Sequence, residues 1–76
     1  MTEQELKYEF KERLKLCMRC KKMNNKQLAD ASGLGEDVIS NYKRGTRMPN
    51  IVNLSKLTYA LGCTANELIP KYKPTE

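Results

Sequence analysis

Basic side chains are concentrated in one part of this 76-residue chain, which has a formal net charge of +5. Residues 38–56 contain Lys43, Arg44, Arg47 and Lys56 and no acidic residue, whereas residues 1–37 are nearly balanced in charge. Lysine and arginine bind phosphate groups through charge-assisted hydrogen bonds. A local excess of them favours a polyanionic partner such as nucleic acid, although a run of cations is also typical of a solvated surface.

Three cysteines are the residues best suited to metal or redox chemistry. Cys17 and Cys20 are three residues apart, so both sulfurs lie on one side of a helix, and Cys63 is the third. A structural zinc site needs four ligands and the chain has no histidine, so we expect no metal and no other cofactor. We expect Cys17 and Cys63 to be small core residues, and Cys20 to be exposed and the candidate for a thiol switch.

The sequence gives little support to catalysis or to a membrane location. It contains no histidine, no nucleophile beside a base and no glycine loop that would hold a phosphate. We therefore expect no enzymatic activity and no small-molecule substrate. The first ten residues are charged, and no segment approaches the roughly 20 apolar residues of a membrane span. The odd number of cysteines suits the reducing cytoplasm.

Apolar periodicity predicts an all-α fold, a compact bundle of about five short helices. The helices are expected over about 2–22, 24–33, 35–43, 50–62 and 64–69. Capping-box patterns begin the first, second and fifth, and glycines end the second, third and fourth. The residues expected in the core are Leu6, Phe10, Leu14, Cys17, Leu28, Ala29, Ala31, Ile39, Tyr42, Ile51, Leu54, Leu57, Leu61, Leu68 and Ile69. Residues 1–69 are thus expected to form one domain, and residues 70–76 a short polar tail.

Residues 24–43 have the spacing of a helix-turn-helix. Ala29 is small enough to let the second helix cross close to the first, and Gly33 supplies the positive φ of the turn. Ile39 is placed to fill the angle between the two helices. In a helix-turn-helix the second helix enters a DNA major groove, so this pattern predicts function as well as fold.

The segment 23–69 resembles the Cro and phage-repressor type of helix-turn-helix protein, the XRE family. The matching features are QLA at 27–29, Gly33, IS at 39–40, RG at 44–45, Pro49, LxxALG at 57–62 and TxxEL at 64–68. The resemblance implies a lambda-repressor-like bundle of four or five helices. It also implies the usual activity of the family, which is sequence-specific operator binding as a homodimer.

The position of each residue in the family implies that Glu36, Asp37 and Asn41 face DNA base edges, with Ser40 close by. An asparagine can bond adenine N6 and N7 together, and a carboxylate can accept from cytosine N4. Acidic residues in the first turn of a helix also interact favourably with the helix dipole. Glu36 and Asp37 therefore read bases, stabilise the helix start, or do both. A third possibility is that they repel DNA and that this face binds a protein.

The resemblance also implies a set of contacts to the DNA backbone. The residues implied to lie against phosphates are Asn25 and Lys26 at the start of the second helix, then Lys43, Arg44, Thr46 and Arg47. Asn25 stands where the family usually has a glutamine that both anchors a phosphate and braces a side chain of the reading helix. Because asparagine is shorter, we expect the phosphate contact here and not the brace.

Together these features predict a small cytoplasmic regulator that binds a palindromic double-stranded DNA operator, with the third helix in the major groove. The type implied is a homodimeric repressor of phages, mobile elements or restriction control. By analogy with the family, the dimer surface is expected around Leu61, Cys63, Ala65 and Ile69. The alternative is a protein-interaction module, such as an antitoxin or anti-repressor, whose helix-turn-helix face binds a protein partner.

Overall fold

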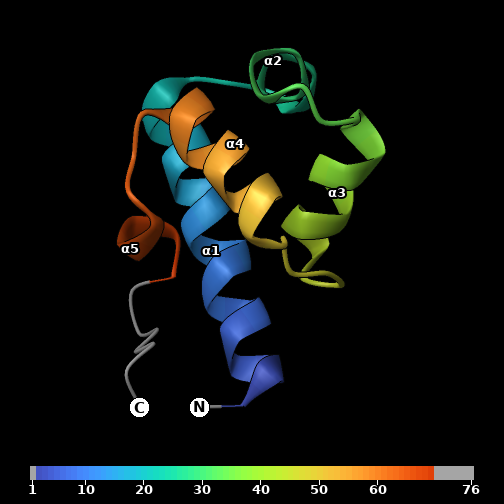
Figure 1. The fold of residues 1–76 in the computed structure, drawn as a ribbon, viewed down its shortest axis with the longest axis vertical. Coiled ribbons are helices and arrows are strands. Elements are labelled where there is room, and N and C mark those ends of the chain that lie inside the picture. Colours follow the sequence, from blue (N-terminus) through green and yellow to red (C-terminus); the bar gives the residue numbers. More distant parts are fainter. Residues whose placement is uncertain (1, 70–76) are drawn as a thin grey trace.

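The computed structural model describes residues 2–69, which form five helices and no strand. α1 (Glu3–Lys21) runs along the long axis of the molecule (Figure 1). Three helices pack against it: α3 (Glu36–Arg44), α4 (Ile51–Leu61) and α5 (Ala65–Leu68). α2 (Asn25–Ser32) packs against α3 and α4. The predicted all-α fold is confirmed. The expected tail at 70–76 lies outside the described residues. Within residues 2–69, no helix is long and apolar enough to cross a membrane.

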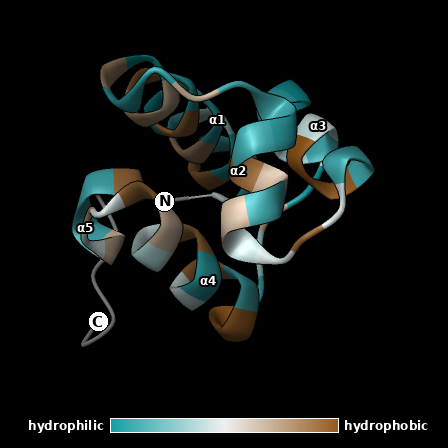
Figure 2. Cartoon of the chain, turned by 90° about the horizontal axis from the view of Figure 1, so that it is seen from above, coloured by the Kyte–Doolittle hydropathy of each residue, from teal (hydrophilic) through white to brown (hydrophobic). Residues whose placement is uncertain are grey.

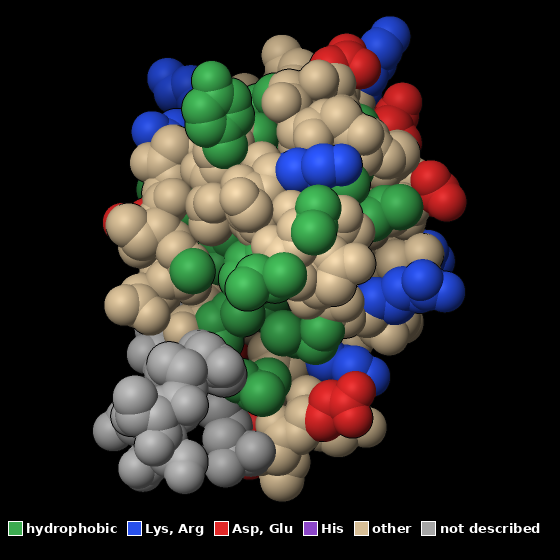
Figure 3. All heavy atoms as spheres, viewed as in Figure 1, with side chains coloured by type: hydrophobic (Ala, Val, Ile, Leu, Met, Phe, Trp, Pro, Cys, Tyr) green, Lys and Arg blue, Asp and Glu red, His purple; other side chains and the backbone are tan. Residues whose placement is uncertain are grey.

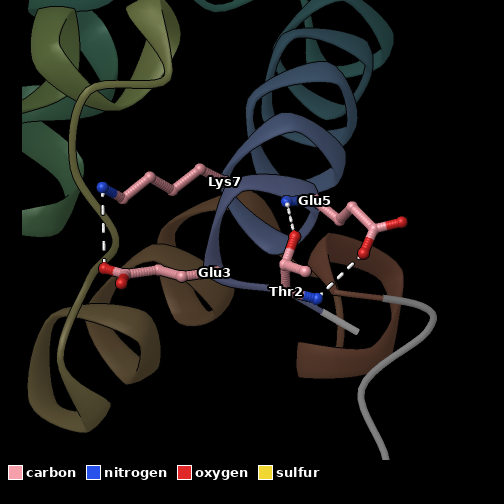
Figure 4. A network of polar contacts seen from close by, with 4 residues as sticks. All are labelled: Thr2, Glu3, Glu5 and Lys7. Carbon is pink, nitrogen blue, oxygen red and sulfur yellow. Dashed lines mark hydrogen bonds and ion pairs between the residues drawn. The ribbon is translucent and has the colours of Figure 1, made fainter.

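Most helix ends follow from local side-chain chemistry. At the start of α1, the Glu5 N–H donates to Thr2 Oγ1 at 3.1 Å and the Thr2 N–H donates to Glu5 Oε1 at 2.9 Å (Figure 4). Each satisfies a backbone group that the helix leaves without a partner. The predicted box of α2 is also present, with Asn24 as N-cap. Only one of the two hydrogen bonds of the capping box predicted for α5 is present. In it, Thr64 Oγ1 accepts from the backbone N–H of Glu67.

One apolar core holds the bundle together, and each helix contributes both hydrophobic and hydrophilic residues (Figure 2). The buried residues are Phe10, Leu14, Met18, Leu28, Ala29, Ile39, Tyr42, Leu57, Leu61, Leu68 and Ile69. Three further residues of the predicted core, Leu6, Cys17 and Leu54, are only partly buried and pack against its edge. In α1 the buried stripe recurs every four residues, so it ends on Met18 where we expected Cys17.

Two predictions of core residues were wrong. Ala31 is exposed, and Ser32 is buried in its place. In a helix with 3.6 residues per turn, Ser32 lies on the same side as the buried residues Leu28 and Ala29. Ala31 lies away from that side. Ile51 is the first residue of α4 and is 83% exposed. Periodicity alone does not show where a helix extends past its neighbours.

Candidate nucleic-acid interface

The turn between α2 and α3 is built as the sequence predicted. Gly33 ends α2 with φ +78°, and a Cβ added there would meet nothing within 4 Å. The glycine is therefore needed for its backbone conformation, not for space. Ala29 is buried where the two helices approach, and Ile39 is fully buried behind α3.

α3 is anchored from behind by Tyr42. The tyrosine ring meets Phe10 of α1 edge-on, with ring centroids 5.5 Å apart. Its hydroxyl accepts a hydrogen bond of 3.0 Å from Asn53 Nδ2 of α4. Tyr42 and Ile39 thus form the back face of α3 and fix its position relative to two other helices.

The remaining polar side chains of α3 form an outward surface, which we call the front face. It consists of Glu36, Asp37, Ser40, Asn41, Lys43 and Arg44. The acidic pair and Arg44 are exposed, and Ser40, Asn41 and Lys43 are half-buried. All six were predicted as site residues, and the structure brings them together on one side of the helix.

Asn25 of α2 braces the front face, contrary to our expectation. Its Nδ2 donates to Ser40 Oγ at 3.2 Å, and its Oδ1 accepts from Lys43 Nζ at 2.8 Å. These three residues and Arg44 line a shallow, open hollow between the two helices. The shorter asparagine reaches the reading helix because its partners are the short Ser40 and the long Lys43. A sequence pattern does not give this distance between helices.

Arg44 fixes the amide of Asn41. Arg44 Nη2 donates to Asn41 Oδ1 at 2.9 Å, one turn away along α3. A carbonyl oxygen accepts two hydrogen bonds, and the Asn41 Nδ2 group has two donors. The amide can therefore engage a base edge while Arg44 holds it in place.

Thr46 is less suited to a phosphate contact than we predicted. Its hydroxyl donates to the Asn41 carbonyl at 3.1 Å, and its backbone N–H donates to the same oxygen at 3.2 Å. Both donors of Thr46 are thus used to close the end of α3, whereas a phosphate offers only acceptors. Arg47, which follows in the loop, is exposed.

Both acidic residues at the start of α3 are exposed, and the carboxylate of Asp37 lies close to the helix start. Gly35 is the N-cap and offers no side chain to the first N–H groups. Asp37 Oδ1 lies 2.6 Å from the point where a Cβ on Gly35 would be, so the carboxylate is turned back over the helix start. This position favours an interaction with the positive end of the helix dipole. Glu36 is exposed in the same turn.

The residues expected at a dimer surface have mixed exposure. Leu61 is 1% and Ile69 8% exposed, so both are used by the core of the monomer. Cys63 is half-buried and Ala65 is exposed. α4 instead presents apolar side chains that the monomer leaves uncovered, since Val52 is 56% and Tyr59 88% exposed.

Comparisons with known proteins agree with this geometry. Residues 14–68 match the helix-turn-helix family. The restriction-modification controller protein C.AhdI from Aeromonas hydrophila is 33% identical, with a TM-score of 0.75 over 79% of this chain and 91% of that chain. A hypothetical transcription factor, NHTF, from Neisseria is 26% identical, with a TM-score of 0.80 over 91% of this chain and 79% of that chain. No curated protein sequence matches the chain.

The family match covers the α2–α3 unit, its turn and the helices that hold it. It confirms the resemblance noted from the sequence, and with it the prediction of a DNA-binding regulator that is not an enzyme. The chain belongs to the Cro- and phage-repressor-like XRE family of helix-turn-helix proteins, which bind DNA and regulate transcription.

Proposed function

We propose that the protein is a homodimeric repressor of the restriction-control type, which acts in the cytoplasm on a palindromic operator and reads the major groove with α3. One observation carries this proposal: the front face of α3 is open to solvent, and its polar side chains are already held by hydrogen bonds. Preorganised donors and acceptors lose less conformational entropy when they meet a base edge. The likeness to a restriction-modification controller supports the assignment of type.

Each residue of the front face has a role that suits its chemistry. Asn41 pairs with adenine N6 and N7, and Glu36 accepts from cytosine N4. Ser40 lies beside them and contacts either a base or the neighbouring backbone. Asp37 stabilises the start of α3.

Phosphates bind at both ends of the front face. At the start of α2, the backbone N–H groups of Asn25 and Lys26 belong to the first turn, where a helix leaves them without partners. Lys43 uses one of its three donors on Asn25 and keeps two for a phosphate. Arg44 and Arg47 extend this positive surface past the end of α3. Thr46 instead closes the end of α3, since both of its donors are bonded to the Asn41 carbonyl.

The dimer forms through the side of the molecule that carries α4 and α5. In the view of Figure 3, hydrophobic side chains gather around the lower end of α4 and below it. Val52 and Tyr59 of α4 are exposed and lie two turns apart on one helical face. Each copy measures 22 and 21 Å along its two shorter axes. Two copies in contact can therefore place their reading helices about 34 Å apart, one turn of DNA.

Sedimentation equilibrium tests this dimer. Tyr59→Asp places a charge in the apolar surface and is expected to shift the protein to a monomer. Tyr8→Asp is the matched control, because Tyr8 is also exposed but lies on α1. A wild-type monomer at high concentration, or equal behaviour of both variants, contradicts the proposed interface.

Selection of bound sites from a random duplex library tests the function itself. We expect a palindromic motif with two half-sites about one turn apart. Weak binding without any enriched sequence contradicts operator binding, and would instead favour a protein partner for the front face.

A further inference from the structure

A second group of reactive side chains lies outside the DNA-binding surface. Cys17 comes from α1, Cys63 from the connection between α4 and α5, and Glu67 from α5. The two sulfurs and a carboxylate oxygen all lie within 4.8 Å of one another. They line a hollow of about 590 Å³ whose other walls are also formed by α1 and the segment 61–67. The group thus joins α1 to the segment 63–67, which is far from α1 in the sequence.

We propose that Cys17, Cys63 and Glu67 form a binding site for a zinc ion, with the fourth position open to water from the hollow. Thiolate and carboxylate are both ligands of Zn²⁺, at about 2.3 Å and 2.0–2.2 Å respectively. Ligand atoms around a tetrahedral ion are therefore about 3.5–3.8 Å apart. The present spacing requires only small side-chain movements to reach that geometry.

A bound divalent cation would leave the site close to neutral. Two thiolates and one carboxylate carry three negative charges, of which the metal offsets two. Arg13 and Lys21 line the same hollow and stand near the sulfurs. They reduce the remaining negative charge.

The two thiols are free and half-buried. Burial, followed by the neighbouring Cys17, raises the pKa of Cys63 to about 11. Burial also raises the pKa of Cys17. A coordinated metal displaces the thiol protons.

Glu67 is the residue that the cysteine pattern alone does not reveal. Its capping-box spacing predicts that the carboxylate binds back to Thr64, whereas the structure has only the bond from the Glu67 backbone N–H to Thr64 Oγ1. The carboxylate is near the sulfurs instead. A bound metal would tie α1 to α5 and is expected to raise the melting temperature of the protein. This inference does not depend on the proposed operator binding.

Titration of the reduced 76-residue chain with Co²⁺, followed by competition with Zn²⁺, tests the site. We expect a thiolate-to-cobalt charge-transfer band that Zn²⁺ abolishes. Cys17→Ser and Cys63→Ser should weaken binding by more than about 100-fold, since loss of even an outer-shell partner costs 10–100-fold. Cys20→Ser is the matched control, because Cys20 is exposed one turn away on α1, and it should bind as the wild type does.

Glu67→Gln keeps the test decisive if a cysteine variant fails to fold, because Glu67 is exposed and its replacement is nearly isosteric. We expect it to lose affinity as well, and to lose the zinc-dependent rise in melting temperature. Absence of the cobalt band, an unaffected Glu67→Gln variant, or loss of binding in Cys20→Ser overturns the assignment.

Discussion

The two faces of α3 differ in what their side chains contact. The back face, Ile39 and Tyr42, is buried against α1 and α4 and contributes to stability. The front face is polar and exposed or half-buried, and its contacts are hydrogen bonds to α2 and along α3. The side chains of α3 that stabilise the fold therefore lie on one side of the helix, and those proposed to contact DNA lie on the other. Substitutions on the back face should change stability, and those on the front face should change DNA binding.

Ile39→Ala is the strongest test of this separation. Ile39 is fully buried, and removal of a buried isoleucine side chain costs about 2–5 kcal/mol of unfolding free energy. Urea unfolding followed by circular dichroism measures this loss. Ser40→Ala, the next residue but on the front face, is the control and should change the unfolding free energy by about 1 kcal/mol or less. Similar losses for the two variants would contradict a division by face.

Arg44→Ala and Arg47→Ala should separate two kinds of contact. Loss of a charge-assisted hydrogen bond to phosphate costs about 1.5–3 kcal/mol of binding free energy, and each variant should lower the salt slope by about one unit. Arg47→Ala is expected to weaken all sequences alike. Arg44→Ala should also reduce discrimination at the base that Asn41 reads, because Arg44 holds that amide. Affinities on a panel of single-base operator variants, measured across salt concentrations, distinguish these outcomes.

Asn25→Ala tests the brace between α2 and the front face. It removes the hydrogen bonds to Ser40 and Lys43, each worth about 0.5–1.5 kcal/mol. We expect a loss of DNA affinity of about tenfold with a small change in unfolding free energy. Lys26→Ala, the neighbouring residue without these bonds to α3, is the control and should lower the salt slope. An Asn25→Ala variant that binds DNA normally would show that the brace has no part in recognition.

The smallest effects are expected from the acidic pair. Asp37→Asn should lower stability by about 0.3–1 kcal/mol through loss of its interaction with the helix dipole, and leave sequence preference unchanged. Glu36→Gln should leave stability unchanged and alter the preferred base at one position of each half-site. Thermal unfolding and operator-panel affinities, measured on both variants, check this. If Asp37→Asn alters the base preference and Glu36→Gln lowers stability, the roles assigned to the two residues are wrong.

Sequence periodicity and capping patterns predicted the helices, the turn at Gly33 and the back face of α3, because these depend on neighbours within one or two helical turns. Ala31 and Ile51 were mispredicted because burial also depends on which neighbouring helix covers a residue. The brace from Asn25 and the approach of Glu67 to the thiols join residues of different helices. Such contacts depend on how the helices pack, which no local pattern specifies.

The central claim is that the front face of α3 reads DNA sequence, and Asn41→Ala tests it most directly. Wild type and variant are compared on the selected operator and on duplexes with each base pair changed in turn. We predict that the variant loses about 1–3 kcal/mol of discrimination at one A·T position in each half-site, and keeps its preferences elsewhere. An unchanged pattern of preferences, or a uniform loss at all positions, would contradict base reading by this face.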